Sequence, residues 1–320
     1  MAKYLSLTLL FVAVVTIKSF SQTKKNENYI DYYNLVNEAS FWFYEQQYDS
    51  AILFYEKAIQ SVNVSSGIDR YNLARSYWEV NRKKDALKLL SQSKHIEGLQ
   101  DIFIDDTTYF EGMTVSQKSR LVKKLIKNEL PYNKKHNEFV QSLFKKDQRL
   151  RILIRDSIRP YYEKDSIIMG EYLEKLRETD SINGLELINY VKSNGMPGGV
   201  HGQFHKLSII FVHMSKEWFV SNYRTLFKEI NKGNLDPYFF AKGMDRAFKQ
   251  NPCERFTIYN AYFHDKDYTD PWLLYVNRLS IGLSPYYIDT WNLYPKGQSP
   301  KRTAMFDFYK KHKTQFNYLK

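Results

Sequence analysis

Small and aromatic residues near the start of the chain recur after thirty-five residues, and this repeat constrains the fold more than any other feature of the sequence. The first copy contains Ala39, Trp42, Ala51, Tyr55 and Ala58. The second copy contains Ala74, Tyr77, Ala86, Leu90 and Ser93. Alanines allow two helices to approach closely, and the large residues fill the space between them. Turn-like stretches at 46–49 and 81–83 complete the pattern, so each copy predicts a helix, a turn and a second helix.

Residues 30–95 resemble two tetratricopeptide repeats, a motif with a period of about 34 residues that carries Ala-x-x-x-Tyr/Leu in its second helix. The resemblance implies stacked helix pairs with an extended concave surface. A stack of two needs another element over its open end. Residues 114–117 read Thr-Val-Ser-Gln, a capping box that opens a helix ending before Pro131. We expect this helix to cover the stack with its apolar face, which consists of Leu121, Val122, Leu125 and Ile126.

The rest of the chain also predicts helices, because apolar residues recur at helical spacing and strand-like alternation is scarce. Two such stripes are Met169, Tyr172, Leu173 and Leu176, and Leu185, Leu187, Ile188 and Val191. Residues 194–199 form a helix breaker. Asp236 and Pro237 form a helix start, with aspartate at the N-cap and proline in the first turn. We predict an all-α protein in which tetratricopeptide-like hairpins pack against a larger multi-helix domain.

The first 21 residues have the organisation of a signal peptide. Lys3 supplies a positive charge, residues 5–17 are apolar, and Ser-Phe-Ser at 19–21 forms a cleavage site before Gln22. This apolar run is shorter than the roughly 20 residues that a spanning helix needs, and an uncleaved anchor is the alternative. Cys253 is the only cysteine, so no intramolecular disulfide stabilises the chain. We predict an exported protein, periplasmic or secreted, with no transmembrane segment after removal of the signal.

The charge of the chain is basic and unevenly distributed. Without Lys3 and Lys18 of the leader, 45 basic residues face 35 acidic ones. Residues 118–151 hold eleven Lys or Arg against three acidic residues, and residues 296–320 hold seven against Asp307. Such stretches attract anionic polymers or acidic partners, or form solvated helix faces, and we favour solvated faces. We divide the chain into the signal peptide at 1–21, two repeats at 22–97, a capping and connecting region at 98–136, a helical domain at 137–290 and a basic tail at 291–320.

The region 137–290 carries an ordered set of polar residues and short motifs. They are Asp147, Gln148 and Arg151; Asp180 and Asn183; Gly195 and Pro197; His213; Asp245 and Arg246; Tyr259; and Arg278, Ile281, Gly282, Leu283 and Pro285. In this order they resemble the pattern of a family of bacterial, often exported, helical domains of unknown function: Asp-Gln-x-x-Arg, Asp-x-x-Asn, Gly-Trp-Pro, Gln-His-Ala, Asp-Arg, Tyr-Gly-Thr-Gln and Arg-x-x-Ile-Gly-Leu-x-Pro. This chain departs from the pattern at Met196, beside the histidine at Val212 and Met214, and at 260–262. The resemblance implies an all-helical domain and no particular activity.

His213 lies in an apolar run at 207–214, which predicts a central helix around a buried imidazole. Such an imidazole needs partners for both ring nitrogens. We expect Asp245 to orient His213 and Tyr259 to complete the network, with Arg246 as the fourth member of a candidate catalytic set. The alternative, which we favour, is a structural polar network that fixes helix register. The candidate binding residues are Asp147, Gln148, Arg151, Asn183 and Arg278.

Three histidines, His201, His205 and His213, are spaced close to one helical face. The His-Glu-x-x-His motif of metalloproteases needs a glutamate that residues 202–204 do not provide. We therefore predict no metal site. Nucleophile-elbow, phosphate-loop and nucleic-acid motifs are absent from the sequence, which predicts no cofactor.

Two functions fit these patterns. The first is an exported helical scaffold that binds a protein, or else an anionic polymer or an envelope component, through the concave or basic face. The second is an enzyme of unknown class with His213, Asp245, Arg246 and Tyr259 at its centre. We favour the scaffold. Convergence of those four side chains beneath an open pocket would favour the enzyme, and a sealed arrangement would favour the scaffold.

Overall fold

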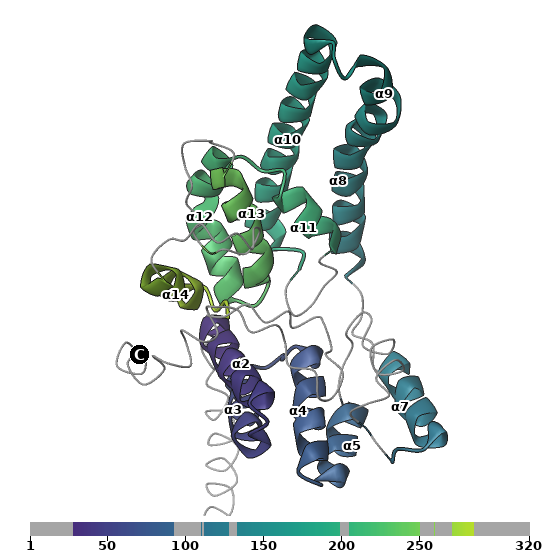
Figure 1. Ribbon diagram of the computed structural model, residues 1–320, viewed down its shortest axis with the longest axis vertical. Helices are drawn as coiled ribbons and strands as arrows, with labels where there is room; N and C mark the ends of the chain where they lie inside the picture. The colour runs from purple at the N-terminus through teal and green to yellow at the C-terminus, as the bar shows by residue number, and fades with distance from the viewer. Residues whose placement is uncertain are drawn as a thin grey trace, which may run out of the picture.

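The computed structural model of the 320-residue chain describes residues 28–92, 110, 112–127, 133–198, 205–249, 259 and 271–284. Over these ranges the chain forms helices and turns and no strand, which confirms the predicted all-α class (Figure 1). The predicted signal peptide, Cys253 and the basic tail lie outside the described residues. No helix in the described ranges combines the length and the apolar composition needed to cross a membrane.

Two helical hairpins form the N-terminal part. They consist of α2 (Tyr29–Tyr44), α3 (Tyr48–Ser61), α4 (Gly67–Glu79) and α5 (Lys83–Gln92) (Figure 1). Gln46 and Asn81 occupy the turns with φ of 58° and 61°, so both predicted turns are confirmed. The predicted crossing alanines have no exposed surface: Ala39, Ala51, Ala58, Ala74 and Ala86. Close packing of the helices follows from these small residues.

Helix α7 (Val115–Lys127) packs against α5, where we expected a covering helix. Its predicted capping box is present: Gln117 N donates to Thr114 Oγ1 over 3.2 Å, and Thr114 N donates to Gln117 Oε1 over 2.9 Å. Leu121 is buried in the N-terminal core together with Phe110 and Met113. The side chains of Leu125 and Ile126, and Pro131, lie outside the described residues.

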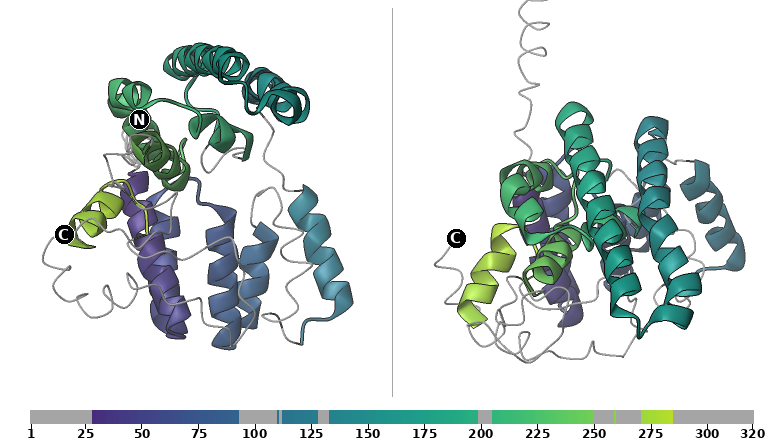
Figure 2. Two further views of the ribbon diagram at one scale, coloured as in Figure 1. Left: turned by 45° about the horizontal axis from the view of Figure 1, so that its top comes forward. Right: turned by 90° about the horizontal axis from the view of Figure 1, so that it is seen from above.

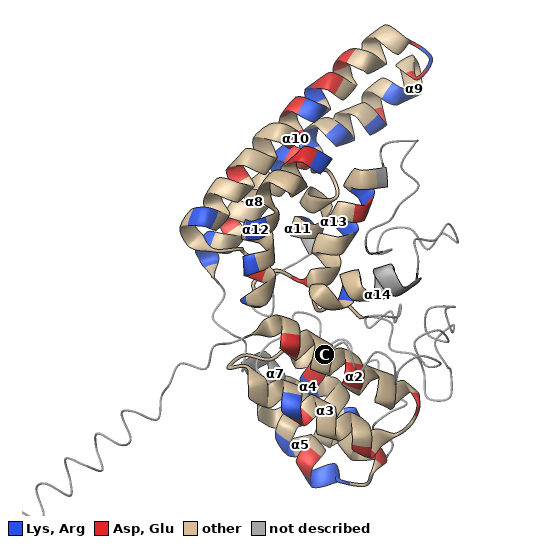
Figure 3. Ribbon diagram, turned by 90° about the vertical axis from the view of Figure 1, so that its left-hand side faces the viewer, with Lys and Arg blue, Asp and Glu red and all other residues tan. Residues whose placement is uncertain are grey.

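A long hairpin begins the C-terminal part and projects away from the other helices (Figures 1 and 2). It consists of α8 (Lys134–Leu153), the π-helical turn η1 (Ile154–Ile158), α9 (Arg159–Tyr162) and α10 (Ser166–Asn194). The π turn comes directly before Pro160, which has no N–H to continue the α-helical ladder. Figure 3 shows basic and acidic segments interspersed along this hairpin.

Three further helices pack near the base of the hairpin: α11 (His205–Phe211), α12 (Lys216–Asn231) and α13 (Pro237–Lys249) (Figure 2). They share a second core with α8 and α10, where Phe211, Phe219 and Phe240 are fully buried. The last described helix, α14 (Pro271–Ser280), contacts α2, and Ile281 and Leu283 after it belong to this second core. The predicted helix start is confirmed, because Asp236 Oδ1 accepts from Tyr238 N over 2.7 Å.

The two apolar stripes predicted on α10 are only partly correct. Leu187, Ile188 and Val191 are buried, but Leu185 is exposed. In the other stripe Leu173 is exposed, and Met169, Tyr172 and Leu176 are half-buried. The reason is that this part of α10 lies in the projecting arm of the hairpin, where only α8, η1 and α9 lie beside it.

The first turns of α2 join the two cores. Gly233 packs directly on the ring of Tyr29, since a Cβ atom there would lie 2.5 Å from the ring. Gly282 packs on Tyr33, where an added Cβ atom would lie 2.8 Å from Tyr33 Cβ and 3.1 Å from the ring atom Cδ2. Both glycines have positive φ, so both the backbone conformation and the close contact favour glycine. Asn37 Nδ2 also donates to the carbonyl of Gly282 over 3.1 Å.

Candidate functional site

Asp147 in the middle of α8 is the centre of a polar cluster at the base of the hairpin. Its side chain is fully buried. His213 Nδ1 lies 2.8 Å from Asp147 Oδ1, and Gln148 Nε2 donates to Asp147 Oδ2 over 2.6 Å. Arg151, one helical turn further along, has its Nε 3.5 Å from Asp147 Oδ2. Two hydrogen-bonding side chains and one guanidinium charge therefore compensate the buried carboxylate, as burial of a charge requires.

A second carboxylate, Asp180 of α10, completes this cluster. Its Oδ1 accepts a hydrogen bond from Arg151 Nη2, so Arg151 faces both aspartates. The side chain of Asp180 is 19% exposed and that of His213 is 13% exposed. Solvent therefore reaches the edge of the cluster while Asp147 stays covered.

The two carboxylates have pKa values shifted in opposite directions. Burial alone would raise the pKa of Asp147, but the hydrogen bond and charge of His213, with Arg151 and Gln148, outweigh it and hold that pKa below its usual value. Burial raises the pKa of Asp180 above its usual value, and the bond and charge of Arg151 offset only part of this effect. Opposed shifts of neighbouring acids are typical of acid–base sites.

His213 lies in the turn that follows α11, and not on a helix as we expected. The chain turns there because Ser215 caps α12, its Oγ accepting from Trp218 N over 3.2 Å. The turn is held against α10 at Gly184, whose carbonyl accepts from Trp218 Nε1 over 2.9 Å. A Cβ on Gly184 would lie 2.8 Å from Trp218 and 2.9 Å from Met214. Close contact at this glycine therefore sets the position of the histidine.

Asn183, the fourth predicted binding residue of this set, lies one turn beyond Asp180 on α10. It is buried, and within the described structure its Nδ2 has no hydrogen-bond partner. The same is true of Arg151 Nε, whose 3.5 Å approach to Asp147 is an ion pair without hydrogen-bond geometry. Two buried donors without acceptors are unusual, since the large majority of buried side-chain polar atoms have a hydrogen-bond partner.

The other predicted residues form a separate network. Tyr259 N donates to Asp245 Oδ1 over 2.8 Å, and Arg278 donates to the carbonyls of Tyr259 and Ser284. Asp245, Tyr259 and Arg278 are all buried, and burial raises the pKa of the Tyr259 phenol, with Tyr223 and Asp245 adding to the shift. Arg246 is half-buried on α13.

The expectation that Asp245 orients His213 is therefore wrong. The bond to His213 comes from Asp147, which lies 66 residues away in the sequence. The four residues of the candidate catalytic set do not form one hydrogen-bonded group, because His213 belongs to the Asp147 cluster and Asp245 and Tyr259 belong to the Arg278 network.

Asp147, Asp180 and His213 also have the spacing of a metal-ligand set, with one ligand atom from each within 4.8 Å of the others. Arg151, however, contacts both carboxylates and supplies the positive charge that a metal ion would supply. His201 and the side chain of His205 lie outside the described residues.

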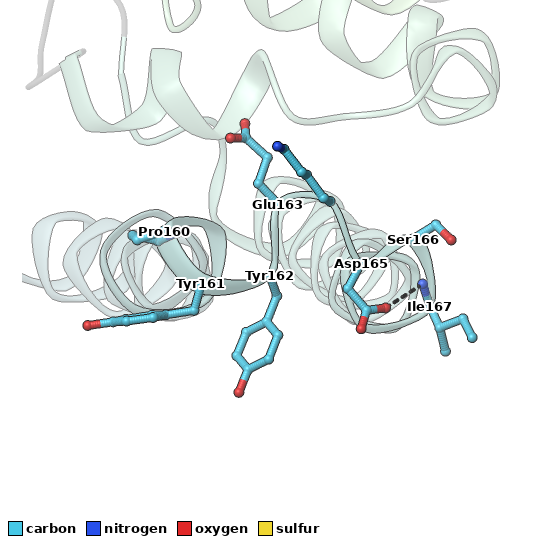
Figure 4. Close-up of a pocket in the computed structure, with 8 residues that line it drawn as sticks. Pro160, Tyr161, Tyr162, Glu163, Asp165, Ser166 and Ile167 are labelled. Carbon is cyan, nitrogen blue, oxygen red and sulfur yellow. Dashed lines mark hydrogen bonds between the residues drawn. The ribbon is translucent and has the colours of Figure 1, made fainter.

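An open hollow lies at the far tip of the hairpin, on the turn between α9 and α10 (Figure 4). Its lining consists of the consecutive residues 160–167, and Asp165 caps α10 there by accepting from Ile167 N over 3.1 Å. No other element contributes to this lining. The hollow follows from the shape of one turn and is not a site assembled from distant segments.

Asp180 is the residue of the cluster that our candidate list missed. The signal was present, because Asp180 and Asn183 belong to the ordered motif set and share one face of a helix at spacing i, i+3. An acidic residue on the same helix face as a candidate binding residue should itself have been a candidate.

Comparison with known proteins identifies no protein-family model, no curated protein and no solved structure that matches this chain.

Proposed function

We propose that the cluster of Asp147, Arg151, Asp180 and His213 is the acid–base centre of an enzyme, with His213 as general base. The observation that carries this proposal is the 2.8 Å contact between His213 Nδ1 and the buried Asp147. An ionised carboxylate only accepts hydrogen bonds, so Nδ1 holds a proton, and in the neutral form of the ring Nε2 carries the lone pair that a general base needs. No partner for Nε2 occurs among the described residues, and the ring is partly exposed.

The two aspartates support different roles in such a centre. Asp147, held by His213, Gln148 and the charge of Arg151 and with a lowered pKa, stays ionised and orients the imidazole. Asp180, with a raised pKa and an exposed edge, is the better proton donor. A histidine that accepts a proton from water and an acid that protonates a leaving group are the two requirements of hydrolysis. The reaction class we infer is therefore hydrolytic acid–base catalysis on a polar substrate.

A substrate-independent experiment tests the general-base assignment. Diethyl pyrocarbonate acylates neutral, accessible imidazole nitrogens, and peptide mass spectrometry reports the rate at each histidine. We expect rapid modification of His213, with the half-buried His136 as an internal reference. Substitution Asp147→Asn should slow the reaction at His213 and leave His136 unchanged, and Asp245→Asn should change neither. An unreactive His213 in folded protein would refute the proposal.

A panel of ester, phosphoester, amide and glycoside substrates then tests for turnover. Loss of a single general base typically lowers the rate by about 10²–10⁴-fold. Activity that falls by such a factor in His213→Gln and survives in Asp245→Asn would assign the reaction to this cluster. Activity retained by His213→Gln would remove the residue from the mechanism.

The second candidate function is an exported scaffold for a protein partner, and the N-terminal hairpins favour it. Their fully buried alanines at the predicted crossings support the tetratricopeptide resemblance, whose implied concave surface binds partners. Leu53 of α3 is an apolar side chain that is 49% exposed on these hairpins.

Site-specific photocrosslinking in cells tests the scaffold. A photoreactive residue at Leu53 should capture a defined partner from the envelope. The matched control is Val220 of α12, which is 60% exposed but lies in the C-terminal part. Equal capture at both positions, or none at Leu53, would count against a binding surface on the hairpins.

A further inference from the structure

Two carboxyl groups lie beside the joint that the first turns of α2 form between the two cores, and neither has a positive partner among the described residues. Asp69 of α4 is 6% exposed, and Asp236 at the start of α13 is half-buried. Neither forms an ion pair within the described residues. Tyr32 donates to Asp69 Oδ2 over 2.5 Å, and the hydroxyl of Tyr32 in turn accepts from Ser66 N over 2.8 Å. Asp236 accepts from Tyr238 N as the helix cap. Hydrogen bonds hold both groups, and no cation in the described ranges neutralises them.

Tyrosines of α2 connect both carboxyl groups to the joint. Tyr32, which donates to Asp69, has its ring 5.6 Å from the ring of Tyr29 and 5.3 Å from that of Tyr33. Gly233, three residues before Asp236, packs on Tyr29, and Gly282 packs on Tyr33. Burial raises the pKa of Tyr33, and the charges of Asp236 and Asp69 raise it further. The titratable and charged groups around the pair are Tyr29, Tyr32 and Tyr33 of α2, Tyr55 of α3, and Arg70 and Arg75 of α4.

The neighbouring arginines are engaged elsewhere. Arg70 Nε donates to Ser65 Oγ over 2.7 Å, and the Arg75 guanidinium lies over the ring of Phe43 at 4.8 Å. Burial raises the pKa of Asp69 to about 7, the hydrogen bond from Tyr32 opposes the shift, and the charge of Asp236 adds to it. Burial raises the pKa of Asp236 to about 6. Each acid favours its protonated form in the closed joint.

We propose that the joint between the two cores is a proton-dependent latch, closed when Asp69 and Asp236 are protonated and loosened when both are ionised. A raised carboxyl pKa means that the closed state binds more protons than the open state. Stabilisation by the two acids is therefore complete below the unfolded carboxyl pKa of about 4, and it is lost progressively as the pH rises from there through about 6 to 7. Two negative charges beside the tyrosines of α2 then repel each other, and the contacts of α2 with α12 and α14 weaken.

Hydrogen exchange at pH 5.5 and pH 8, corrected for intrinsic rates, tests the latch. We expect protection of residues 29–37 and 279–284 to fall about tenfold or more at pH 8, because one pKa unit corresponds to a factor of ten. Amides in the middle of α3 and α12 should keep their protection. A loss of stability of the whole protein at pH 8 would lower the protection of those core helices as well.

Asparagine substitutions provide matched variants, because asparagine caps helices as well as aspartate does and still accepts from Tyr32. The Asp69→Asn/Asp236→Asn double variant should keep the joint protected at both pH values. Asp85→Asn on exposed α5 is the control and should behave as the parent. If the double variant does not fold, Asp236→Asn alone should remove part of the pH dependence. A parent with equal protection at both pH values, or asparagine variants that still open at pH 8, would overturn the proposal.

Discussion

The pairing of His213 with Asp147, and not with Asp245, can be measured as a coupling free energy. Asp147 is a buried charge with two hydrogen-bond partners and the Arg151 guanidinium around it, so its loss resembles the breaking of a buried ion pair. Asp147→Ala should therefore cost about 3–5 kcal/mol. Asp147→Asn keeps one acceptor oxygen and should cost less, about 2–3 kcal/mol. His213→Gln removes the same contact from the other side and should cost about 1–3 kcal/mol.

A double-mutant cycle separates the two candidate pairs. Because Asp147→Asn and His213→Gln each remove one shared contact, the double variant should be more stable than additivity predicts by about 1–2 kcal/mol. Asp245→Asn and His213→Gln share no recorded contact, so their effects should add within about 0.5 kcal/mol. Urea unfolding followed by circular dichroism at pH 7 gives all the values, provided that the m-values agree. A larger coupling for the Asp245 pair would refute the arrangement that we describe.

The pH dependence gives an internal check on the same pair. The folded-state pKa of Asp147 lies below its unfolded value, so its stabilisation is complete above the unfolded pKa. This contribution is lost as the pH falls through the folded pKa. The stability difference between the parent and Asp147→Asn should therefore be constant near neutral pH and shrink in acid, below about pH 4. A difference that persists unchanged at pH 2 would show that packing, and not charge, determines the effect.

Three further predictions follow from packing and sequence. Ala51→Leu and Ala86→Leu place a large side chain at a fully buried crossing and should each cost about 1–3 kcal/mol, measured by thermal unfolding; melting within a degree of the parent would contradict the repeat alignment. Gly184→Ala should also cost about 1–3 kcal/mol, because its Cβ would clash beside the histidine turn, whereas Gly170→Ala, with open space around it, should be neutral or stabilising. Mass spectrometry of exported protein should find Gln22 as the first residue, and an intact leader would exclude the free exported form.

Local chemistry made much of the fold predictable. The capping box at Thr114, the N-cap at Asp236 and the turns at Gln46 and Asn81 each depend on residues within a few positions of one another. Their side chains satisfy backbone groups of the same segment, so the sequence window contains the whole interaction. Such features needed no knowledge of the tertiary structure.

The partner of His213 could not be found in the same way. Asp147 and Asp245 are both acidic residues on helices, and both belong to the ordered motif set. Which of the two aspartates binds His213 depends on which helix faces the turn after α11, and that contact joins segments 66 residues apart. The prediction that the outer part of α10 has a buried apolar stripe failed for a related reason. An apolar stripe predicts a covered face, but only the tertiary structure shows whether a neighbouring helix covers it.

The uneven burial of α10 has a consequence for the mechanical behaviour of the hairpin. Its buried residues, from Asn183 to Val191, all lie in the half next to the core, and the half from Ser166 to Asp180 has none. That outer half is about as long as the shortest helices that are stable alone, roughly 12–15 residues. Local unfolding that starts at the tip therefore requires little free energy until it reaches the Arg151–Asp180 ion pair, which holds α8 and α10 together. The outer part of the hairpin can thus unfold locally far more often than the domain unfolds. The candidate acid–base cluster lies at the boundary between this outer part and the part packed on the core.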